Sequence, residues 1–220
     1  MRHFDRDIEE LKELILRMGA LVEEAITRSI SALVDRDTHL AETVLASDDA
    51  VDRMELEIDD HTLELIAKMQ PTASDLRFVA TAMKITPELE RIADLAVDVA
   101  ERAIELNREP PLKPIVDLPR QAAIAQQMLR DALDAFVRRD SSLARAVIGR
   151  DDEIDLLTEQ SFRELLTYML EDPRNISRAI RLTFIGKYFE RIADHATNIC
   201  EMVVYLTEGK VIKHSVEAGR

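Results

Sequence analysis

Two acidic motifs occur twice in this chain of 220 residues, and their carboxylates are its best candidates for chemistry. The segment Glu90–Asp94, which reads Glu-Arg-Ile-Ala-Asp, recurs unchanged as Glu190–Asp194. A pair of aspartates four residues apart precedes each copy: Asp48 with Asp52, and Asp151 with Asp155. On a helix, residues four apart project from the same face, so each pair presents two carboxylates together. Pairs on adjacent helices can supply the hard oxygen ligands that Mg²⁺, Mn²⁺, Ca²⁺ or iron require.

The acidic faces extend beyond these pairs. Asp98 and Glu101 follow the first motif, and Asn198 and Glu201 follow the second. On a helix these positions fall within about 80° of arc, and the apolar face points about 140° away from them. That apolar face consists of Val79, Ala82, Leu89, Ala93, Ala96, Ala100 and Ala103. We therefore expect the acidic faces on the outer side of a helical bundle.

Spacing alone leaves two interpretations of these faces open. With 43 acidic residues in the chain, several pairs four apart arise by chance, so a solvated acidic surface is the simpler interpretation. Four pairs repeated in register are stronger evidence for metal binding, because like charges stacked on a helix destabilise it unless they are neutralised. A longer stripe, Asp48, Asp52, Glu55 and Asp59, persists in the second half only as Asp151 and Asp155.

The histidines give little support to catalysis. None of the five has a glutamate three residues before it, so the Glu-x-x-His signature of di-iron oxidases is absent: His3, His39, His61, His195 and His214. His195 adjoins Asp194 and can serve as a peripheral ligand, although its counterpart is Leu95. The sequence contains no glycine-rich phosphate loop, no cysteine–histidine cluster and no nucleophile motif. We expect a protein without enzymatic activity.

Composition points to a soluble helical protein. Hydrophobic residues make up 46% of the chain, whereas aromatic residues make up only 4% and there are five glycines. A net charge of −14 repels nucleic acid and anionic lipid, so cations and basic protein surfaces are the expected partners. Cys200 is the single cysteine. We expect it to be buried as a small hydrophobic residue, in a protein that works in a reducing compartment. No apolar run approaches the roughly 20 residues that cross a bilayer, which predicts a cytoplasmic protein without membrane insertion.

Apolar periodicity predicts an all-α protein built from two tandem, internally duplicated antiparallel three-helix bundles with six main helices. The expected first-half helices cover residues 4–34, 48–69 and roughly 73–107, with a short helix after Asp37. The expected second-half helices cover residues 118–137, a stretch beginning at Asp151, and a stretch from Pro173 to about Gly209. Pro87 should kink the third helix, and Thr72 and Asp75 form a weak capping box before it.

Four clustered prolines predict the domain boundary: Pro110, Pro111, Pro114 and Pro119. We assign residues 1–109 to the first bundle, 110–119 to a linker, 120–209 to the second bundle and 210–220 to a C-terminal tail. The halves align at an offset of 103 residues upstream and of 100 at the Glu-Arg-Ile-Ala-Asp motifs. The turn between the helix that carries the aspartate pair and the helix that carries Glu-Arg-Ile-Ala-Asp is therefore three residues shorter in the second half.

The repeated Glu-Arg-Ile-Ala-Asp, the upstream aspartate pairs, Asp75-Leu-Arg77 and the duplicated plan resemble the PhoU family over nearly the whole chain. The resemblance implies a cytoplasmic negative regulator without catalytic activity. It would couple a phosphate ABC importer, through its ATPase subunit, to a sensor histidine kinase and repress the response to phosphate starvation. The resemblance also implies multinuclear metal ions, iron or zinc in some members and Mg²⁺ or Mn²⁺ in others. Homodimerisation is plausible for such an elongated bundle pair.

Carried onto this sequence, the resemblance implies two metal sites. The implied ligands of the first are Asp48, Asp52, Glu90 and Asp94, and those of the second are Asp151, Asp155, Glu190 and Asp194. Asp98 and Asn198 lie one turn further along and can join them. Two alternatives stay open at this point: a metal-free acidic helical adaptor with no role in phosphate metabolism, and a di-metal carboxylate enzyme.

Overall fold

The computed structural model describes residues 3–69, 73–112 and 117–212, and all regular structure in these ranges is helical. The first half contains α1 (His3–Val34), α2 (Thr38–Met69) and α3 (Ala73–Asn107). The second contains α4 (Asp117–Arg138), α5 (Ser141–Ile148), α6 (Asp151–Glu171), the short 3₁₀ helix η1 (Pro173–Asn175) and α7 (Ile176–Glu208). The predicted all-α fold is therefore confirmed.

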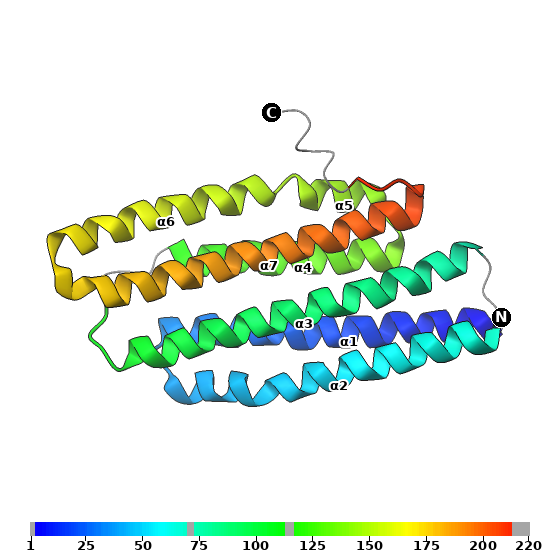
Figure 1. Cartoon of the computed structure of the whole chain (residues 1–220), viewed down its shortest axis with the longest axis horizontal. Helices are drawn as coiled ribbons and strands as arrows, with labels where there is room; N and C mark the ends of the chain where they lie inside the picture. The colour runs from blue at the N-terminus through cyan, green and yellow to red at the C-terminus, as the bar shows by residue number, and fades with distance from the viewer. Residues whose placement is uncertain (1–2, 70–72, 113–116, 213–220) are drawn as a thin grey trace.

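The helices form two three-helix bundles stacked side by side. In the first bundle α1, α2 and α3 all contact one another, and in the second α4 and α7 pack with α5 and α6, which together take the place of α2. The bundles meet where α3 packs along α7 and α1 packs along α4. Figure 1 shows α2 and α6 at opposite outer edges, with the four contacting helices between them.

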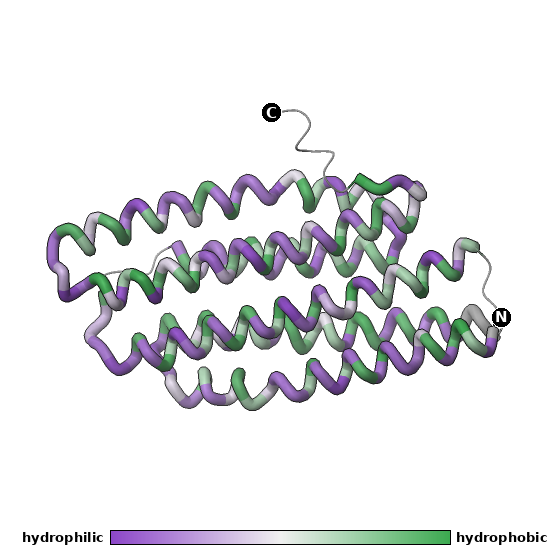
Figure 2. The backbone as a smooth tube through the Cα atoms, in the orientation of Figure 1, coloured by the Kyte–Doolittle hydropathy of each residue, from purple (hydrophilic) through white to green (hydrophobic). Residues whose placement is uncertain are grey.

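The core follows from the apolar stripe of each helix. All seven residues of the predicted apolar face of α3 are buried, and the tube view shows apolar residues alternating with polar ones along the helices (Figure 2). The helices bury one stripe and leave the other to solvent, as amphipathic helices of a bundle do. Cys200 belongs to this core, and burial raises the pKa of its thiol to about 12, so it is a hydrophobic residue as predicted.

The same turn closes the first helix of each bundle. Arg36 and Arg139 adopt left-handed backbone conformations with φ of 55° and 52°. The aspartate that follows each accepts backbone N–H bonds from the next helix, from Leu40 to Asp37 and from Ser142 and Leu143 to Asp140. Such caps satisfy donors that have no partner within the helix. The predicted ends of these two helices, at residues 34 and 137, are therefore confirmed to within one residue.

The two halves differ in the middle of the second helix, where one prediction was wrong. We expected Ser47 or Asp48 to start a new helix, but α2 continues from Thr38 to Met69. The Ser47 hydroxyl bonds to the Val44 carbonyl 2.8 Å away, so it is not available to cap a helix start. The matching position to Ala46 in the second half is Gly149, which separates α5 from α6.

Several boundary predictions meet the structure only in part. α4 begins at Asp117, inside the segment that we assigned as linker, and α3 runs through Pro87 without interruption. Asp172 caps η1 with Pro173 at its first position, and Gly209 ends α7 with φ of 68°, as the sequence indicates. The capping box at Thr72, the linker residues 113–116 and the tail residues 213–220 lie outside the described residues. No helix in the described part of the chain is long and apolar enough to cross a membrane.

Gly19 of α1 lies against Leu133 of α4. A Cβ atom on Gly19 would approach Cδ1 of Leu133 more closely than normal van der Waals contact allows. We expect Gly19→Val to lower the free energy of unfolding by about 1–3 kcal/mol, as overpacking of a core does. Urea denaturation measures this change in the free energy of unfolding, and Ala20→Val at the neighbouring exposed position is the control. Equal stability of the two variants would contradict a close α1–α4 contact.

Candidate metal sites

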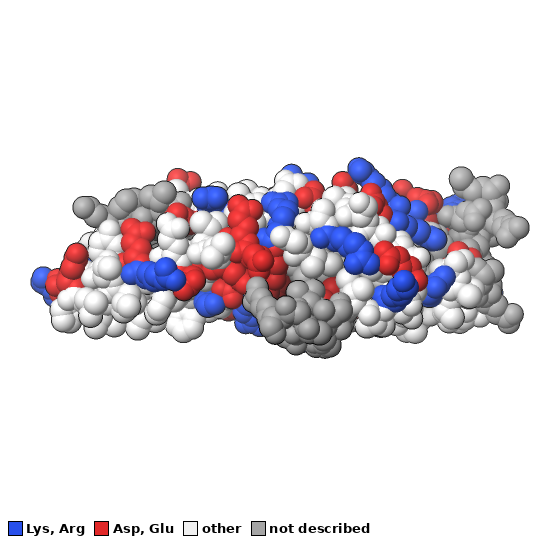
Figure 3. Space-filling view, turned by 90° about the horizontal axis from the view of Figure 1, so that it is seen from above, with Lys and Arg blue, Asp and Glu red and all other residues white. Residues whose placement is uncertain are grey.

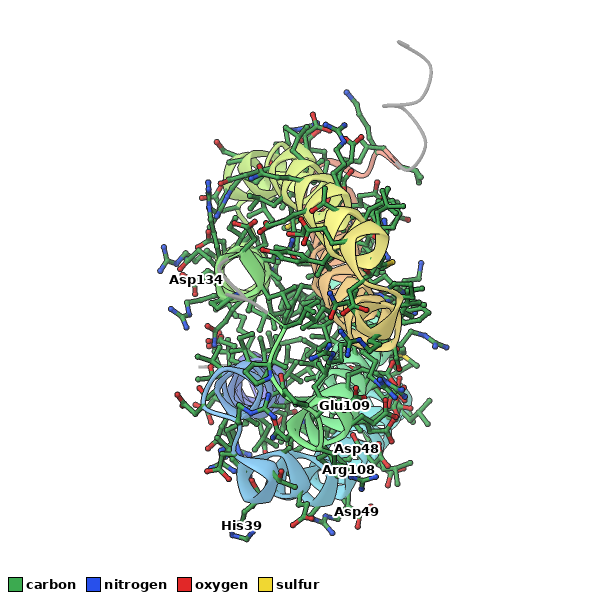
Figure 4. All side chains as sticks on the ribbon, turned by 90° about the vertical axis from the view of Figure 1, so that its left-hand side faces the viewer. His39, Asp48, Asp49, Arg108, Glu109 and Asp134 are labelled. Atoms are coloured by element: carbon green, nitrogen blue, oxygen red, sulfur yellow. The ribbon has the colours of Figure 1, made fainter. Side chains whose placement is uncertain are left out.

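The first acidic site comprises Asp48 and Asp52 on α2 and Glu90 and Asp94 on α3. Burial raises the pKa of Asp48, and the charges of Asp52 and Asp94 raise it further. Burial likewise raises the pKa of Glu90, with added repulsion from Asp94 and from Glu55. The carboxylates of the two helices therefore act on one another across the α2–α3 contact. Figure 4, viewed from one end of the molecule, shows Asp48 beside α3.

The second acidic site comprises Asp151 and Asp155 on α6 and Glu190 and Asp194 on α7. Burial and, after it, repulsion from Asp194 and Asp155 raise the pKa of Asp151 to about 6. The Thr197 hydroxyl donates a 3.4 Å hydrogen bond to Asp151 and partly offsets it. Burial and then Glu190 and Asp155 raise the pKa of Asp194. Figure 3 shows acidic side chains gathered near the middle of the face that α5 and α6 cover.

The two sites carry different counter-charges. Burial raises the pKa of Glu55 and Glu90, and Arg91 partly offsets this rise, so Arg91 screens the first site. In the second site Lys187 forms an ion pair with Glu190, with Nζ 2.6 Å from a carboxylate oxygen. The counterpart of Lys187 in the first half is Pro87, so the first site has no equivalent lysine. The second site therefore has one carboxylate already paired.

Asp98 and Asn198 face the contact between the two bundles, one turn beyond the acidic sites. Asn198 donates a 3.0 Å amide hydrogen bond to Glu88 of α3, and Glu88 also bonds to His195 Nδ1 at 2.7 Å. Asp98 acts on Tyr188 of α7, and its own pKa is raised by burial and by Glu101, with a smaller contribution from Asp94 of the first site. Both residues are half-buried where the two bundles meet, so the expectation of an outer position is wrong for them.

The physical reason is the drift of a four-residue ladder around its helix. Each step of four residues turns by about 40°, so two steps turn by about 80°, enough to reach the neighbouring helix. The exposed members Asp52, Asp94, Asp155 and Asp194 remain on the outer side, as predicted. Sequence reasoning missed Glu88 altogether, because its counterpart is Tyr188 and no repeat identifies it.

The chemistry of the two sites suits a hard divalent cation. Each offers four carboxylates from two helices and no cysteine or histidine among them, a set that favours Mg²⁺, Mn²⁺ or Ca²⁺ over softer metals. In residues 3–69, 73–112 and 117–212, however, no three His, Cys, Asp or Glu side chains converge closely enough to hold an ion. The donors fit in kind and helix position, and cation binding would require their side chains to rotate toward a common point.

These features define a class of protein: a duplicated helical bundle protein whose halves each carry facing acidic stripes. The family model described as the PhoU domain matches residues 15–103 and again residues 118–203. The starts of the two matches differ by 103 residues and their ends by 100, which agrees with the offsets of the repeat.

Relatives and solved structures agree with this match. The chain is 45% identical over 209 residues to a phosphate-specific transport system accessory protein PhoU homolog from Aquifex aeolicus, covering 95% of each protein. It also resembles the crystal structure of PhoU from Pseudomonas aeruginosa (TM-score 0.90, 40% identity, 94% of this chain and 100% of that one). The regulatory protein PhoU from Streptococcus pneumoniae has a TM-score of 0.88 at 29% identity, with 95% and 99% coverage. The chain belongs to the PhoU family.

Asp151→Asn tests the repulsion within the second acidic site. The folded pKa of about 6 lies above the ordinary 3.8, so the folded protein binds more protons than the unfolded chain between these values. Stability of the metal-free wild type therefore falls as pH rises from about 4 to about 6, and the variant avoids that loss. After discounting for partial exposure, we expect the variant to gain about 1 kcal/mol at pH 8 and little at pH 4. Thermal unfolding in EDTA at both pH values measures this. The same change in stability at both would contradict the assignment.

Glu88→Ala tests the polar contact across the two bundles. Removing this carboxylate leaves the half-buried His195 and Asn198 without the partner that they share. We expect the free energy of unfolding to fall by about 1–3 kcal/mol, the usual result of leaving buried polar groups unpaired. Chemical denaturation measures it, and Glu57→Ala on the exposed face of α2 is the control. A loss no larger than that of the control would exclude a stabilising role for Glu88.

Proposed function

We propose that this chain is a non-catalytic accessory regulator of a phosphate transport system. The observation that carries the proposal is the match of both halves, over nearly the full length, to relatives named as phosphate-specific transport system accessory proteins. Identity of 40–45% over at least 95% of the chain supports a shared role as well as a shared fold. The duplicated bundle offers long helical surfaces for partners.

In the full form of the proposal, the chain acts in the cytoplasm as a homodimer. It contacts the ATPase subunit of a phosphate ABC importer and a sensor histidine kinase, and it represses the starvation response when phosphate is plentiful. The two bundles share a frame but differ in surface, which supports contact with two different partners. An acidic chain of net charge −14 suits basic protein surfaces better than nucleic acid.

The proposal includes a cation at each acidic site. Asp48, Asp52, Glu90 and Asp94 would hold one, and Asp151, Asp155, Glu190 and Asp194 the other. A bound cation supplies charge neutralisation, which would offset the repulsion that adds to burial in raising the pKa of Asp48, Asp151 and Asp194. The carboxylates themselves would then fix α2 against α3 and α6 against α7. In this arrangement the acidic sites stabilise the surface that partners contact.

The regulatory role is tested in a host strain that lacks this chain. We expect a reporter of the phosphate-starvation response to become active at high phosphate, and the wild-type gene to restore repression. Co-purification of a tagged chain with the importer's ATPase subunit and with the kinase identifies the partners. A deletion strain whose reporter and phosphate uptake match those of the parent would overturn the proposed function.

The cation sites are tested by elemental analysis and by thermal unfolding with added Mn²⁺ or Mg²⁺. At a cation concentration 100 times Kd, one site adds about 2.7 kcal/mol of stability. A variant with Glu90, Asp94, Glu190 and Asp194 all changed to Ala should lose both the bound metal and this gain. The matched control changes four exposed acids outside the sites to Ala: Glu10, Glu13, Glu57 and Asp60. If the cation stabilises both variants equally, the proposed cation sites are wrong, and the chain is then a metal-free adaptor.

A further inference from the structure

An exposed apolar surface lies on the outer face of the α6–α7 hairpin. We call it the hairpin patch, and it consists of Phe162, Leu166 and Leu170 from α6 with Ile176, Ile180 and Phe184 from α7. These six side chains are between 40% and 78% exposed. Residues four apart share a face of their helix. Because the two helices run antiparallel from the turn at Asp172–Asn175, the two rows lie alongside each other, at the left-hand end in Figures 1 and 2.

The hairpin patch is continuous with the second acidic site. A groove of about 320 Å³ lies between α6 and α7, at the place where the hairpin patch meets the second acidic site. Phe162 and Thr183 line one part of it, and Asp155, Glu159 and Glu190 line another, together with Lys187, which pairs with Glu190. The groove has the size for one bulky apolar side chain, and its acidic end favours a positive charge beside that side chain. One face of the hairpin is thus apolar at its tip and acidic toward the middle of the molecule.

The first bundle provides an internal comparison for the hairpin patch. At four of its six positions the first half has polar or small residues: Asp59, Ala67, Ala80 and Lys84 stand where Phe162, Leu170, Ile180 and Phe184 stand in the second. Only Leu63 and Leu76 keep the apolar character. Because α2 and α3 pack without the four large side chains, the shared frame does not need them. Contiguous exposed apolar surface with a polar border is typical of a protein contact.

We propose that the hairpin patch, together with the second acidic site, docks an amphipathic helix of a partner protein. The docking helix has large apolar side chains over about two turns and Lys or Arg over the following two turns, a span of about 22 Å for 15 residues. The apolar half lies on the hairpin patch, and the basic half lies on Asp155, Glu159, Glu190 and Asp194 when the second acidic site holds no divalent cation. Charge complementarity selects this occupant, because the acidic border repels anionic lipid headgroups. The inference rests on the proposed function in requiring a protein partner, and it specifies that partner's chemistry.

The probe is a synthetic 16-residue helical peptide with leucines at helical spacing in one half and lysines in the other. Fluorescence anisotropy measures its binding to the full chain. The test variant combines Phe162→Asp, Leu170→Ala, Ile180→Ala and Phe184→Lys, which installs the residues of the first half and leaves net charge unchanged. The control variant combines Leu63→Ala and Leu76→Ala on the first bundle.

We expect the test variant to bind the peptide at least tenfold more weakly than the wild type and the control variant to bind it normally. A peptide with glutamate in place of lysine should not bind the wild type. Equal affinity of both variants, or tight binding of the glutamate peptide, would overturn the proposal. Circular dichroism establishes that the variants remain helical, as expected for exposed positions.

Two further measurements identify other occupants of the hairpin patch. If the wild type sediments as a dimer and the test variant as a monomer, a second copy covers the patch and the proposal is wrong. If vesicles of phosphatidylcholine and phosphatidylglycerol bind the wild type but not the test variant, lipid covers it and the proposal is also wrong. Failure of the proposed function is a separate result: the wild-type gene would then not restore phosphate repression, whatever the peptide does.

Discussion

Burial of one face of α3 and α7 decides where every other feature of the molecule lies. With 3.6 residues per turn, a helix that buries Leu89, Ala93 and Ala96 must direct Glu90 and Asp94 elsewhere. Because α2 lies on that side, its own carboxylates meet them. These carboxylates repel one another, which destabilises the fold. The apolar core outweighs this repulsion, because the burial of each large apolar side chain contributes about 1.5–3 kcal/mol to stability. The acidic sites are thus a consequence of core packing in both halves.

The contact between the bundles is more polar than either core. Arg181 of α7 binds Glu105 and Glu109 near one end of α3, and His195 and Asn198 bind Glu88 further along. Directional bonds of this kind fix the register of two long antiparallel helices, which apolar side chains alone would fix less strictly. The same contact engages Asp98 and Asn198, which lie one turn beyond the acidic sites.

Periodicity and local capping rules predicted the helices of this chain well. The ends of α1 at Arg36-Asp37, the start at Asp172-Pro173 and the end at Gly209 all have local causes that the sequence displays. The continuity of α2 through Ser47 was not predictable by the same rules. A serine that can cap a helix can equally bond to its own preceding turn, and tertiary packing decides between the two.

The candidate site was predicted less completely than the fold. The facing of Asp48 and Asp94 follows from the helix periods and the bundle, whereas the four-carboxylate sets came from the resemblance to the PhoU family and stay a prediction. The partners of Asp98 and Asn198 depend on how the two bundles pack, and the spacing of residues along one helix does not predict that packing. The role of Glu88 depends on the same packing. The pairing of Glu190 with Lys187 could have been found, because the two residues are three apart on one helix.

The break at Gly149 gives the two halves different mechanical properties. α2 is a single rod of 32 residues, so a displacement at Asp48 is carried to both of its ends. The corresponding stretch of the second half is two rods joined at Gly149 and Arg150, directly before Asp151. α6 is therefore not continuous with α5, which packs on α4 and α7. Of the two acidic sites, the second begins directly after a break between two helices, whereas Asp48 and Asp52 of the first lie within one continuous helix.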